Sequence, residues 1–544
     1  MRNWQGLEER RMGKRFMKRQ SQTARCALAA VISIAAVMTM HSKTFSQAEI
    51  QLETATIKEL GEALGSGALT SETLLKLYLA RIAAYDKKGP NLNSILVLNP
   101  KAMEIARRLD EERKAKGPRG PLHGIPVVVK DTFDTFDMPT TGGFIGLAKS
   151  IPPRDSSAVK KLRDAGAIIL AKTNLSDWFG ERKNPLAWST IAGQVLNPYD
   201  PTRVPGYSSA GTGAALAAYF AAAGLGSDTG GSVLIPAADS SLVGLLPTPG
   251  LMSRAGMIGS SFTQERGGPM GRSVYDVALL LNHLVGYDSD DMITARSLGK
   301  LPAQPYTSFL DANGLKGARI GILRDMYFDG PQHQDGLKLA QTAIDQMRRA
   351  GAIVVDRITT GINIHAAIDN ASLSNFERYE YYNHYLARLG PNAPVRSVEE
   401  MIEKAPDTIS RNVRNSLQIG PIDRNPSYLA ARANQDMLLE IITGLIDRYK
   451  LDALVFPYKT VIAPKVGEDR PAGSVNRLAS YAALPSLLVP AGFTSEGLPI
   501  SMQFLGKQFS EPTLIKLGYA YEQISKNRKT PKTTPALEGE VIKK

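Results

Sequence analysis

Two short loops rich in serine and glycine carry the residues best suited to covalent chemistry. They are PGYSSAG (205–211) and GSDTGGS (226–232), and an apolar run, AALAAYFAAA (214–223), separates them. The run contains no glycine or proline and predicts a buried helix. Each loop places serine hydroxyls beside backbone N–H groups that no regular ladder uses, and glycine permits tight turns there. This layout is typical of a site that activates a serine and stabilises an oxyanion.

The same loops also allow plainer interpretations. Clusters of serine and glycine are commonly flexible connections, and glycine-rich loops can bind phosphate. The phosphate-binding patterns GxxxxGK[ST] and GxGxxG are absent from this stretch, as is the GxSxG pattern of a nucleophile elbow. The chain has six histidines, and none lies in or near the two loops in sequence. Catalytic serines would therefore need a base from another part of the chain.

A lysine upstream is a candidate for that base. The run IPVVVK (125–130) is β-branched and is bounded by glycine and a polar turn, so it predicts a buried strand ending in Lys130. Burying an ammonium ion is costly without a partner, so Lys130 could instead extend to water or pair with Asp131 or Asp134. Burial also lowers the pKa of a lysine, which can make it a base at neutral pH.

Together these motifs resemble those of the amidase signature hydrolases, a family with a Ser–Ser–Lys triad. The resemblance extends from about residue 50 to about residue 527 and also includes a late Glu511. Its motifs follow the family's order: GIPVVVKD (124–131), GAIILAKTNLSDW (166–178), LNPYDPTR (196–203), GYSSAGTGAALAAYFAAAG (206–224), GSDTGGSVLIPA (226–237), GLLPTPG (244–250), GGPMGRSVYDVALLLNHLVGYD (267–288) and LPSLLVPAGFTSEGLPISMQFLG (484–506).

The resemblance implies a role for each matching residue. Ser232 would be the nucleophile, Ser208 a bridging serine next to a cis peptide bond, and Lys130 the base. Neutral Lys130 would take a proton from Ser208, which would take one from Ser232 as it attacks the carbonyl carbon. The relay would then run backwards to protonate the leaving nitrogen, and water would release the acyl group. The oxyanion would be held by the backbone N–H groups of Thr229, Gly230, Gly231 and Ser232, with Ser209 and Asp228 in support.

Several positions depart from the family's pattern. Leu234 stands where the family usually has an arginine close to the nucleophile. Tyr207 and Ala210 stand where glycine is usual, and Leu246 stands where lysine is usual. The three presumed catalytic residues are all present. These departures therefore bear on the surroundings of the site and on the rate, and leave the class of reaction unchanged.

The first 48 residues predict a secretory signal peptide. Basic residues precede an apolar run, CALAAVISIAAVMTM (26–40), and Ser46 and Ala48 suit a cleavage site after Ala48. The run is about 15 residues long, which is short for a membrane-spanning helix, so an uncleaved anchor is the second choice. The expected location is the periplasm or the medium.

Removing this leader changes the composition. The whole chain has a formal net charge of +13, but taking nine of 65 basic and two of 52 acidic residues away leaves 56 against 50, or +6. Nucleic-acid binding loses its main support. The only cysteine, Cys26, is removed as well, so the mature chain can have no disulfide, thiol nucleophile or cysteine metal ligand. No metal motif is present, so we expect no cofactor. The expected partner is a small-molecule amide or related acyl substrate. We expect no stable membrane insertion of the protein once the leader is removed. A homodimer is compatible with the sequence.

The remaining chain alternates helical and apolar β-strand patterns, which is typical of a layered α/β domain. We expect helices at 71–86, 101–115, 156–165, 273–285, 336–350, 431–449 and 511–525, and strands at 125–130, 167–171, 319–323, 352–356, 453–457, 486–489 and 499–504. The family resemblance makes this one α/β/α sandwich around a large mixed sheet, spanning residues 49–527. A polar tail, 528–544, is expected to fray.

The segment 365–430 is expected to determine substrate choice. Its aromatic-rich part, 376–402, is similar to the branch of the family that includes secreted peptide amidases, although ordinary helix packing would explain the aromatics equally well. The leading prediction is an exported hydrolase of carboxamides, a linear-amide amidase. Alternatives are an enzyme acting on esters, anilides or carbamates with the same site, a catalytically inactive periplasmic binding protein, and a cytosolic glutaminyl-tRNA amidotransferase subunit, against which the leader argues.

Overall fold

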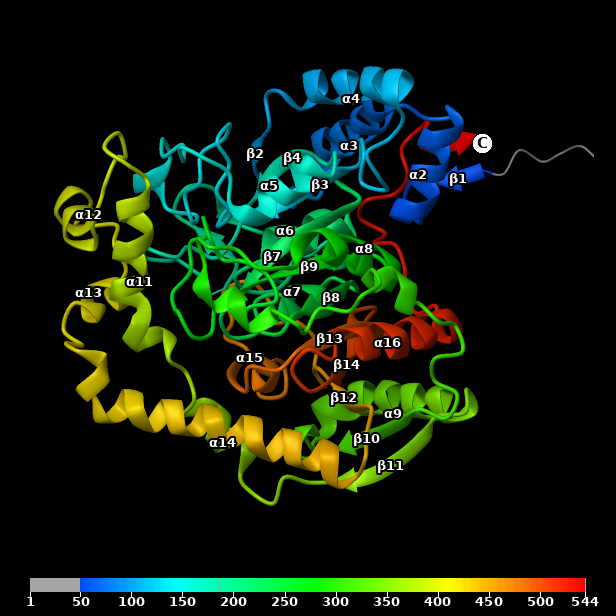
Figure 1. Cartoon of the computed structure of the whole chain (residues 1–544), viewed down its shortest axis with the longest axis vertical. Helices are drawn as coiled ribbons and strands as arrows, with labels where there is room; N and C mark the ends of the chain where they lie inside the picture. The colour runs from blue at the N-terminus through cyan, green and yellow to red at the C-terminus, as the bar shows by residue number, and fades with distance from the viewer. Residues whose placement is uncertain (1–48, 185, 544) are drawn as a thin grey trace, which may run out of the picture. The chain divides into compact units, whose positions relative to one another are not determined.

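A computed structural model describes residues 49–184 and 186–543, so the predicted leader lies outside the described residues. Residues 50–542 form one compact unit built on a sheet of 11 strands. The strand order is β11-β10-β12-β14-β13-β8-β9-β7-β3-β4-β2 (Figure 1). The bounds are β2 Ile95–Leu98, β3 Pro126–Lys130, β4 Ile168–Thr173, β7 Ala223–Asp228, β8 Val243–Leu246, β9 Arg266–Gly271, β10 Arg319–Leu323, β11 Ile353–Ile358, β12 Ala453–Pro457, β13 Ser486–Phe493 and β14 Pro499–Leu505.

The sheet is mixed. Strand β3 pairs in parallel with β4 and β7, and β10 pairs in parallel with β11 and β12, whereas the strands between these groups pair antiparallel. The parallel strands β3, β4 and β12 are buried along their whole length, which explains their continuous apolar patterns. Two small sheets pair β1 (Glu49–Gln51) with β15 (Val541–Lys543) and β5 (Trp188–Ser189) with β6 (Gly193–Gln194).

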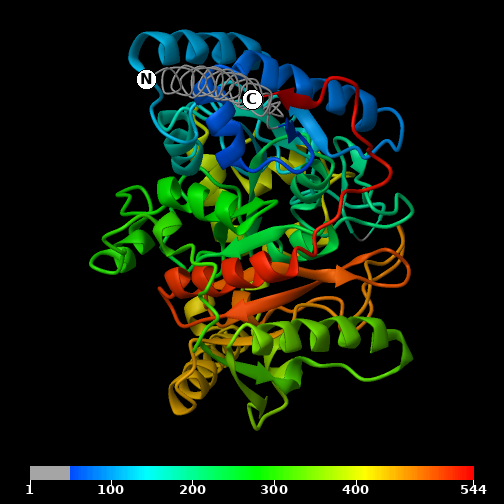
Figure 2. The ribbon, with the colours of Figure 1, turned by 90° about the vertical axis from the view of Figure 1, so that its right-hand side faces the viewer.

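Helices cover both faces of the large sheet. On one face α5, α8, α16 and α9 follow one another, and Figure 2 shows α16 and α9 side by side across the strands. On the other face α6 and α7 pack on each other and on the central strands. The helices are α2 Ile57–Ser66, α3 Ser71–Tyr85, α4 Ala102–Lys116, α5 Ser157–Asp164, α6 Ala210–Ala217, α7 Leu234–Asp239, α8 Val274–Leu284, α9 Gln334–Arg349, α10 Ile364–Asp369, α11 Ser374–Arg388, α12 Val398–Lys404, α13 Arg411–Ser416, α14 Pro426–Arg448, α15 Leu478–Tyr481 and α16 Glu511–Ser525.

This architecture confirms the predicted α/β/α sandwich with a large mixed sheet. Within the described ranges, no helix is both long enough and apolar enough to cross a bilayer.

The alanine-rich run 214–223 is not one helix, contrary to the prediction. Helix α6 ends at Ala217, a turn follows, and Ala223 already begins β7. Tyr219 lies at the turn with a left-handed φ of 62°, and the guanidinium groups of Arg81, Arg272 and Arg528 lie over its ring. The chain must reverse here because β7 pairs with β3, and this long-range pairing overrides the helix propensity of alanine.

The C-terminal tail is packed, contrary to the expectation that it frays. Glu540 is buried and forms an ion pair of 2.7 Å with the fully buried Arg81. The same guanidinium donates to the backbone carbonyl of Thr534, and Pro535 accepts from the Tyr85 hydroxyl. The tail is rich in lysine, threonine and proline, and this composition could not predict the contacts with Arg81 and Tyr85, which lie more than 400 residues earlier in the sequence.

Candidate active site

Lys130 and the second serine loop meet at the carboxyl ends of two neighbouring parallel strands. Lys130 is the last residue of β3, and Ser227 and Asp228 are the last residues of β7, which pairs with β3 from Val127↔Ala223 to Val129↔Leu225. The crevice at the carboxyl ends of strands is where open α/β sheets bind ligands. The two predicted motifs are therefore brought together by strand pairing.

The Lys130 side chain is fully buried and bonded to hydroxyl groups. Its Nζ donates to Ser208 Oγ at 2.6 Å and to Ser227 Oγ at 2.8 Å, and it lies 5.2 Å from the centre of the Trp178 ring. The alternative pairing with acidic neighbours is not observed. Asp131 forms its ion pair with Lys172 at 2.8 Å, and Asp134 accepts from the Tyr385 hydroxyl.

Burial lowers the pKa of Lys130 to about 7, because desolvation disfavours the ammonium form. The negative charges of Glu265 and Asp228 oppose this shift but do not cancel it. Burial in turn raises the pKa of Glu265 to about 7, so neither group is firmly charged at neutral pH. A lysine of this kind can act as a base near pH 7.

Ser208 and Ser232 both line one cavity of about 220 Å³. Each serine is only 6% exposed, and that exposure faces the cavity. Among the described residues there is no hydrogen bond between Ser208 and Ser232, and there is also no cis peptide bond. The cis bond expected next to Ser208 is thus corrected to trans, the form favoured in non-proline bonds by about 3–4 kcal/mol.

Asp228 holds the turn that carries Ser232. Its carboxylate accepts from the backbone N–H of Gly231 at 2.9 Å, from that of Val233 at 2.8 Å and from the hydroxyl of Ser480. Gly231 has a φ of 102°, and a Cβ there would lie 3.1 Å from Ile235 and from the Tyr458 hydroxyl. The turn thus needs glycine at this position.

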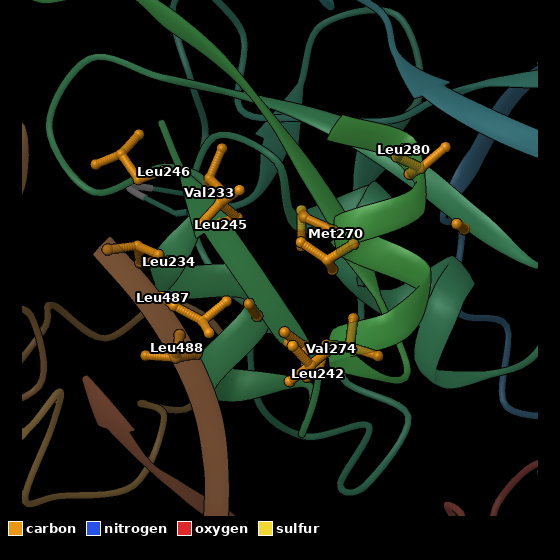
Figure 3. Packing of buried hydrophobic residues seen from close by; sticks show 14 of the residues in the cluster. Val233, Leu234, Leu242, Leu245, Leu246, Met270, Val274, Leu280, Leu487 and Leu488 are labelled. Carbon is orange, nitrogen blue, oxygen red and sulfur yellow. The ribbon is translucent and has the colours of Figure 1, made fainter. Parts of the chain in front are cut away.

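The side chains that follow Ser232 anchor the turn in the core. Figure 3 shows Val233 and Leu234 packed among Leu245, Leu246 and Leu488, and these residues are buried. Leu234 replaces the family's usual arginine, and its surroundings here are apolar, which accounts for a leucine at this position.

Three of the four backbone N–H groups predicted to hold the oxyanion donate to no acceptor among the described residues. In the described part of the chain, no acceptor binds the backbone N–H of Thr229, Gly230 or Ser232. The N–H of Gly231 is already donated to Asp228, so we remove Gly231 from the predicted set of donors. Ser209, predicted as a supporting residue, bonds the backbone of Ser227 in both directions, at 3.2 and 3.3 Å.

Sequence reasoning missed three residues around the site. Ser227 is the second partner of Lys130, Glu265 accepts from the Thr229 hydroxyl at 2.6 Å, and Arg266 donates to the backbone carbonyls of Ala479 and Ser480. The sequence signal for Ser227 was its place two residues before the TGGS turn. Glu265 and Arg266 gave none, because Arg266 begins β9, Glu265 immediately precedes it, and β9 meets β7 only through the sheet.

The segment 365–430, which was expected to determine substrate choice, contributes to the cavity. Helix α11 supplies Arg378 and Tyr382, Ser410 caps the start of α13, and Asn412 lies within α13. The aromatics of α11 also pack normally: Tyr382 and Tyr385 are buried in a cluster with Phe144 and Phe179. Tyr207, a departure from the family pattern, lines the cavity and accepts from Arg182 Nη1 at 3.0 Å. Within residues 49–184 and 186–543, no group of three histidine, cysteine or acidic side chains could hold a metal ion.

The fold and the site define a mixed α/β protein in which a buried lysine is bonded to one of two serines that line a single cavity. The family model described as Amidase matches residues 73–515. A probable amidase of Arabidopsis thaliana is 35% identical over 90% of this chain and 93% of its own length. The A subunit of glutamyl-tRNA(Gln) amidotransferase from Chloroflexus aurantiacus is 33% identical over 87% of this chain and 97% of its own. The crystal structure of native peptide amidase from Stenotrophomonas maltophilia superposes with a TM-score of 0.79 at 35% identity, covering 89% of this chain and 99% of that one.

This chain belongs to the amidase signature family and is a hydrolase of carbon–nitrogen bonds in amides. The resemblance seen in the sequence motifs is thereby confirmed.

Proposed function

We propose that this protein is an exported serine amidase that cleaves linear, non-peptide or terminal carboxamides through an acyl-enzyme on Ser232. The observation that carries the proposal is the hydrogen bond from a buried Lys130, with its pKa lowered to about 7, to Ser208 in the cavity that Ser232 also lines. The likeness to peptide amidase supports an amide at a chain end as the bond that is cleaved.

In the proposed mechanism the amine of Lys130 accepts the Ser208 proton as Ser208 accepts that of Ser232. The Ser232 oxygen bonds to the carbonyl carbon, and the negative charge passes to the carbonyl oxygen, which the N–H groups of Thr229, Gly230 and Ser232 stabilise. Protons return along the same path to the nitrogen, the C–N bond breaks, and ammonia or an amine leaves. Water then adds to the acyl-enzyme by the same relay, which releases the acid and restores Ser232.

Hydrolysis assays with a matched serine variant test this role. Ser232→Ala should reduce the release of ammonia from good amide substrates by about 10³-fold or more, because no covalent intermediate can form. Ser260→Ala is the control, since Ser260 lines the same cavity outside the proposed relay and should retain most of the wild-type rate. Amide turnover that persists in Ser232→Ala would refute the nucleophile. Esters, anilides and carbamates run in parallel would show whether the amide is preferred.

Export is proposed from the basic, apolar and small-residue order of the first 48 residues. N-terminal sequencing of protein recovered outside the cytoplasm should begin at Glu49. A chain that retains its leader would instead support the uncleaved anchor.

A further inference from the structure

Three arginines from distant parts of the sequence line the candidate cavity. Arg182 comes from the segment after β4, Arg378 from α11, and Arg477 from the residue that precedes α15. All three are partly exposed, and Arg182 already donates to the Tyr207 hydroxyl. Guanidinium groups stay charged at any physiological pH. The cavity wall therefore carries three permanent positive charges.

Little negative charge balances them. Asp177 is the one acidic side chain among the described residues that line the cavity, and its carboxylate accepts from the N–H groups of Phe179, Gly180 and Thr190. Neither Arg378 nor Arg477 forms an ion pair with any carboxylate of the described chain.

The charges of these arginines change the pKa of the neighbouring Tyr207. Burial alone would raise the pKa of Tyr207, yet its pKa is lowered from the usual value because Arg182, Arg477 and Arg378 favour the phenolate. Arg182 contributes both its charge and a hydrogen bond of 3.0 Å to the tyrosine hydroxyl. The charges of the three arginines and the Arg182 hydrogen bond together outweigh the effect of burial on this pKa.

The rest of the lining is polar or aromatic. Serine, threonine and Asn412 supply hydroxyl and amide groups, and no aliphatic side chain lines the cavity in the described part of the protein. Such a wall offers a long hydrocarbon chain only the rings of its aromatic residues, and most of its surface is polar. It offers instead many donors to an anion, and guanidinium groups bind carboxylates with paired, charge-assisted hydrogen bonds.

We propose that the cavity selects amide substrates that carry a carboxylate near the bond that is cleaved, with Arg378 and Arg477 binding that carboxylate. This inference rests on the proposed amidase function and names its substrate class. Arg477 also donates through Nε to the Gly230 carbonyl at 3.3 Å, which ties the anion-binding group to the loop of the nucleophile. Arg378 has no bond to that loop, so it is the better position for a substitution.

Matched substrate pairs test the preference. The monoamide of succinic acid is compared with butyramide, and N-acetylglycine with N-propylacetamide, so that the carboxylate lies on either side of the amide. We expect kcat/KM to be at least about tenfold higher for one or both anionic members, and we expect Arg378→Gln to remove most of that preference. Arg424→Gln is the control, because the Arg424 side chain is 88% exposed, and it should keep the wild-type preference.

A binding measurement separates the two proposals. Succinate should raise the Tm of the wild-type protein and should do so much less in Arg378→Gln and Arg477→Gln. Equal kcat/KM for anionic and neutral amides, with Ser232 active and no succinate effect, would overturn the charge preference and leave the amidase proposal intact. An absence of any amide turnover would instead refute the amidase proposal, and the response to succinate would still decide whether the arginines bind a carboxylate.

Discussion

At the scale of single residues, the chemistry of the site depends on the hydrogen-bond partners and the pKa of the Lys130 amine. Lys130 has no carboxylate partner in the described structure, and its hydrogen bonds go to the hydroxyl groups of Ser208 and Ser227. Lys172, one strand away, is equally buried but is paired with Asp131. The contrast explains why burial lowers the pKa of Lys130 and why Lys130 is suited to accept a proton.

The rate should therefore depend on the protonation of Lys130. Because the base must be neutral, kcat/KM should rise with pH through about 7, where the ammonium form loses its proton. Lys130→Ala should reduce the rate by about 10²–10⁴-fold, the usual contribution of a general base. Lys507→Ala is the control, because the Lys507 side chain is 45% exposed and lies outside the relay, and it should keep the wild-type rate. Measured pH–rate profiles check this, and a Lys130→Ala profile that equals the wild type from about pH 6 to about pH 9 would remove Lys130 from the mechanism.

At the scale of elements, the site is a product of strand pairing. Strands β3 and β7 bring Lys130 to Ser227. Ser232 lies in the turn after β7, and the residues that follow it, Val233 and Leu234, pack against side chains of β8 and β13 (Figure 3). The Asp228 carboxylate fixes this turn by accepting hydrogen bonds from the backbone N–H groups of Gly231 and Val233. The geometry of the nucleophile is thus set by a few residues of backbone.

A single methyl group in the turn should disturb that geometry. Gly231→Ala would place a Cβ in a left-handed conformation, 3.1 Å from Ile235, so we expect a loss of about 1–3 kcal/mol of stability and most of the activity. Gly467→Ala is the control, because Gly467 has a φ of 90° with nothing within 4 Å of the added Cβ.

Denaturant unfolding and amide hydrolysis measured on both variants separate strain from function. Both changes should lower the free energy of unfolding, but only Gly231→Ala should lower kcat. Full activity in Gly231→Ala would mean that the turn is not held as described.

Local sequence patterns predicted the parts of the site that lie within one motif. Lys130, Ser208 and Ser232 could be placed because each lies in a short motif that resembles the amidase signature pattern. Ser227 as a partner of Lys130 and the turn at Tyr219 could not, since they follow from pairing between segments about 100 residues apart. Arg378 and Arg477 likewise reach the cavity only through the fold.

At the scale of the whole molecule, the C-terminal segment is joined to the core by a few buried side chains. The ion pair between Arg81 and Glu540 is buried and joins α3 to the C-terminal segment. Arg528 from the same segment lies over the ring of Tyr219, at the turn that leads into β7. The tail therefore supports the region from which the site is built.

Breaking this ion pair should destabilise the protein. Glu540→Ala leaves the Arg81 guanidinium buried without its carboxylate, which costs about 3–5 kcal/mol in comparable pairs. Three carbonyl groups still accept from Arg81, so the lower end of that range is expected. Urea unfolding checks this against Glu538→Ala, an exposed neighbour. A cost equal to that of the control would show that the tail contributes little.

The most direct test of the account is covalent labelling of the proposed nucleophile. Intact-mass spectrometry after treatment with a fluorophosphonate should reveal one adduct on the wild-type protein, none on Ser232→Ala, and an unchanged single adduct on Ser260→Ala. Labelling should also slow as the pH falls below about 7, because protonated Lys130 cannot accept the proton. No adduct on folded wild-type protein, or an adduct that persists in Ser232→Ala, would contradict the claim that Lys130 and Ser208 activate Ser232.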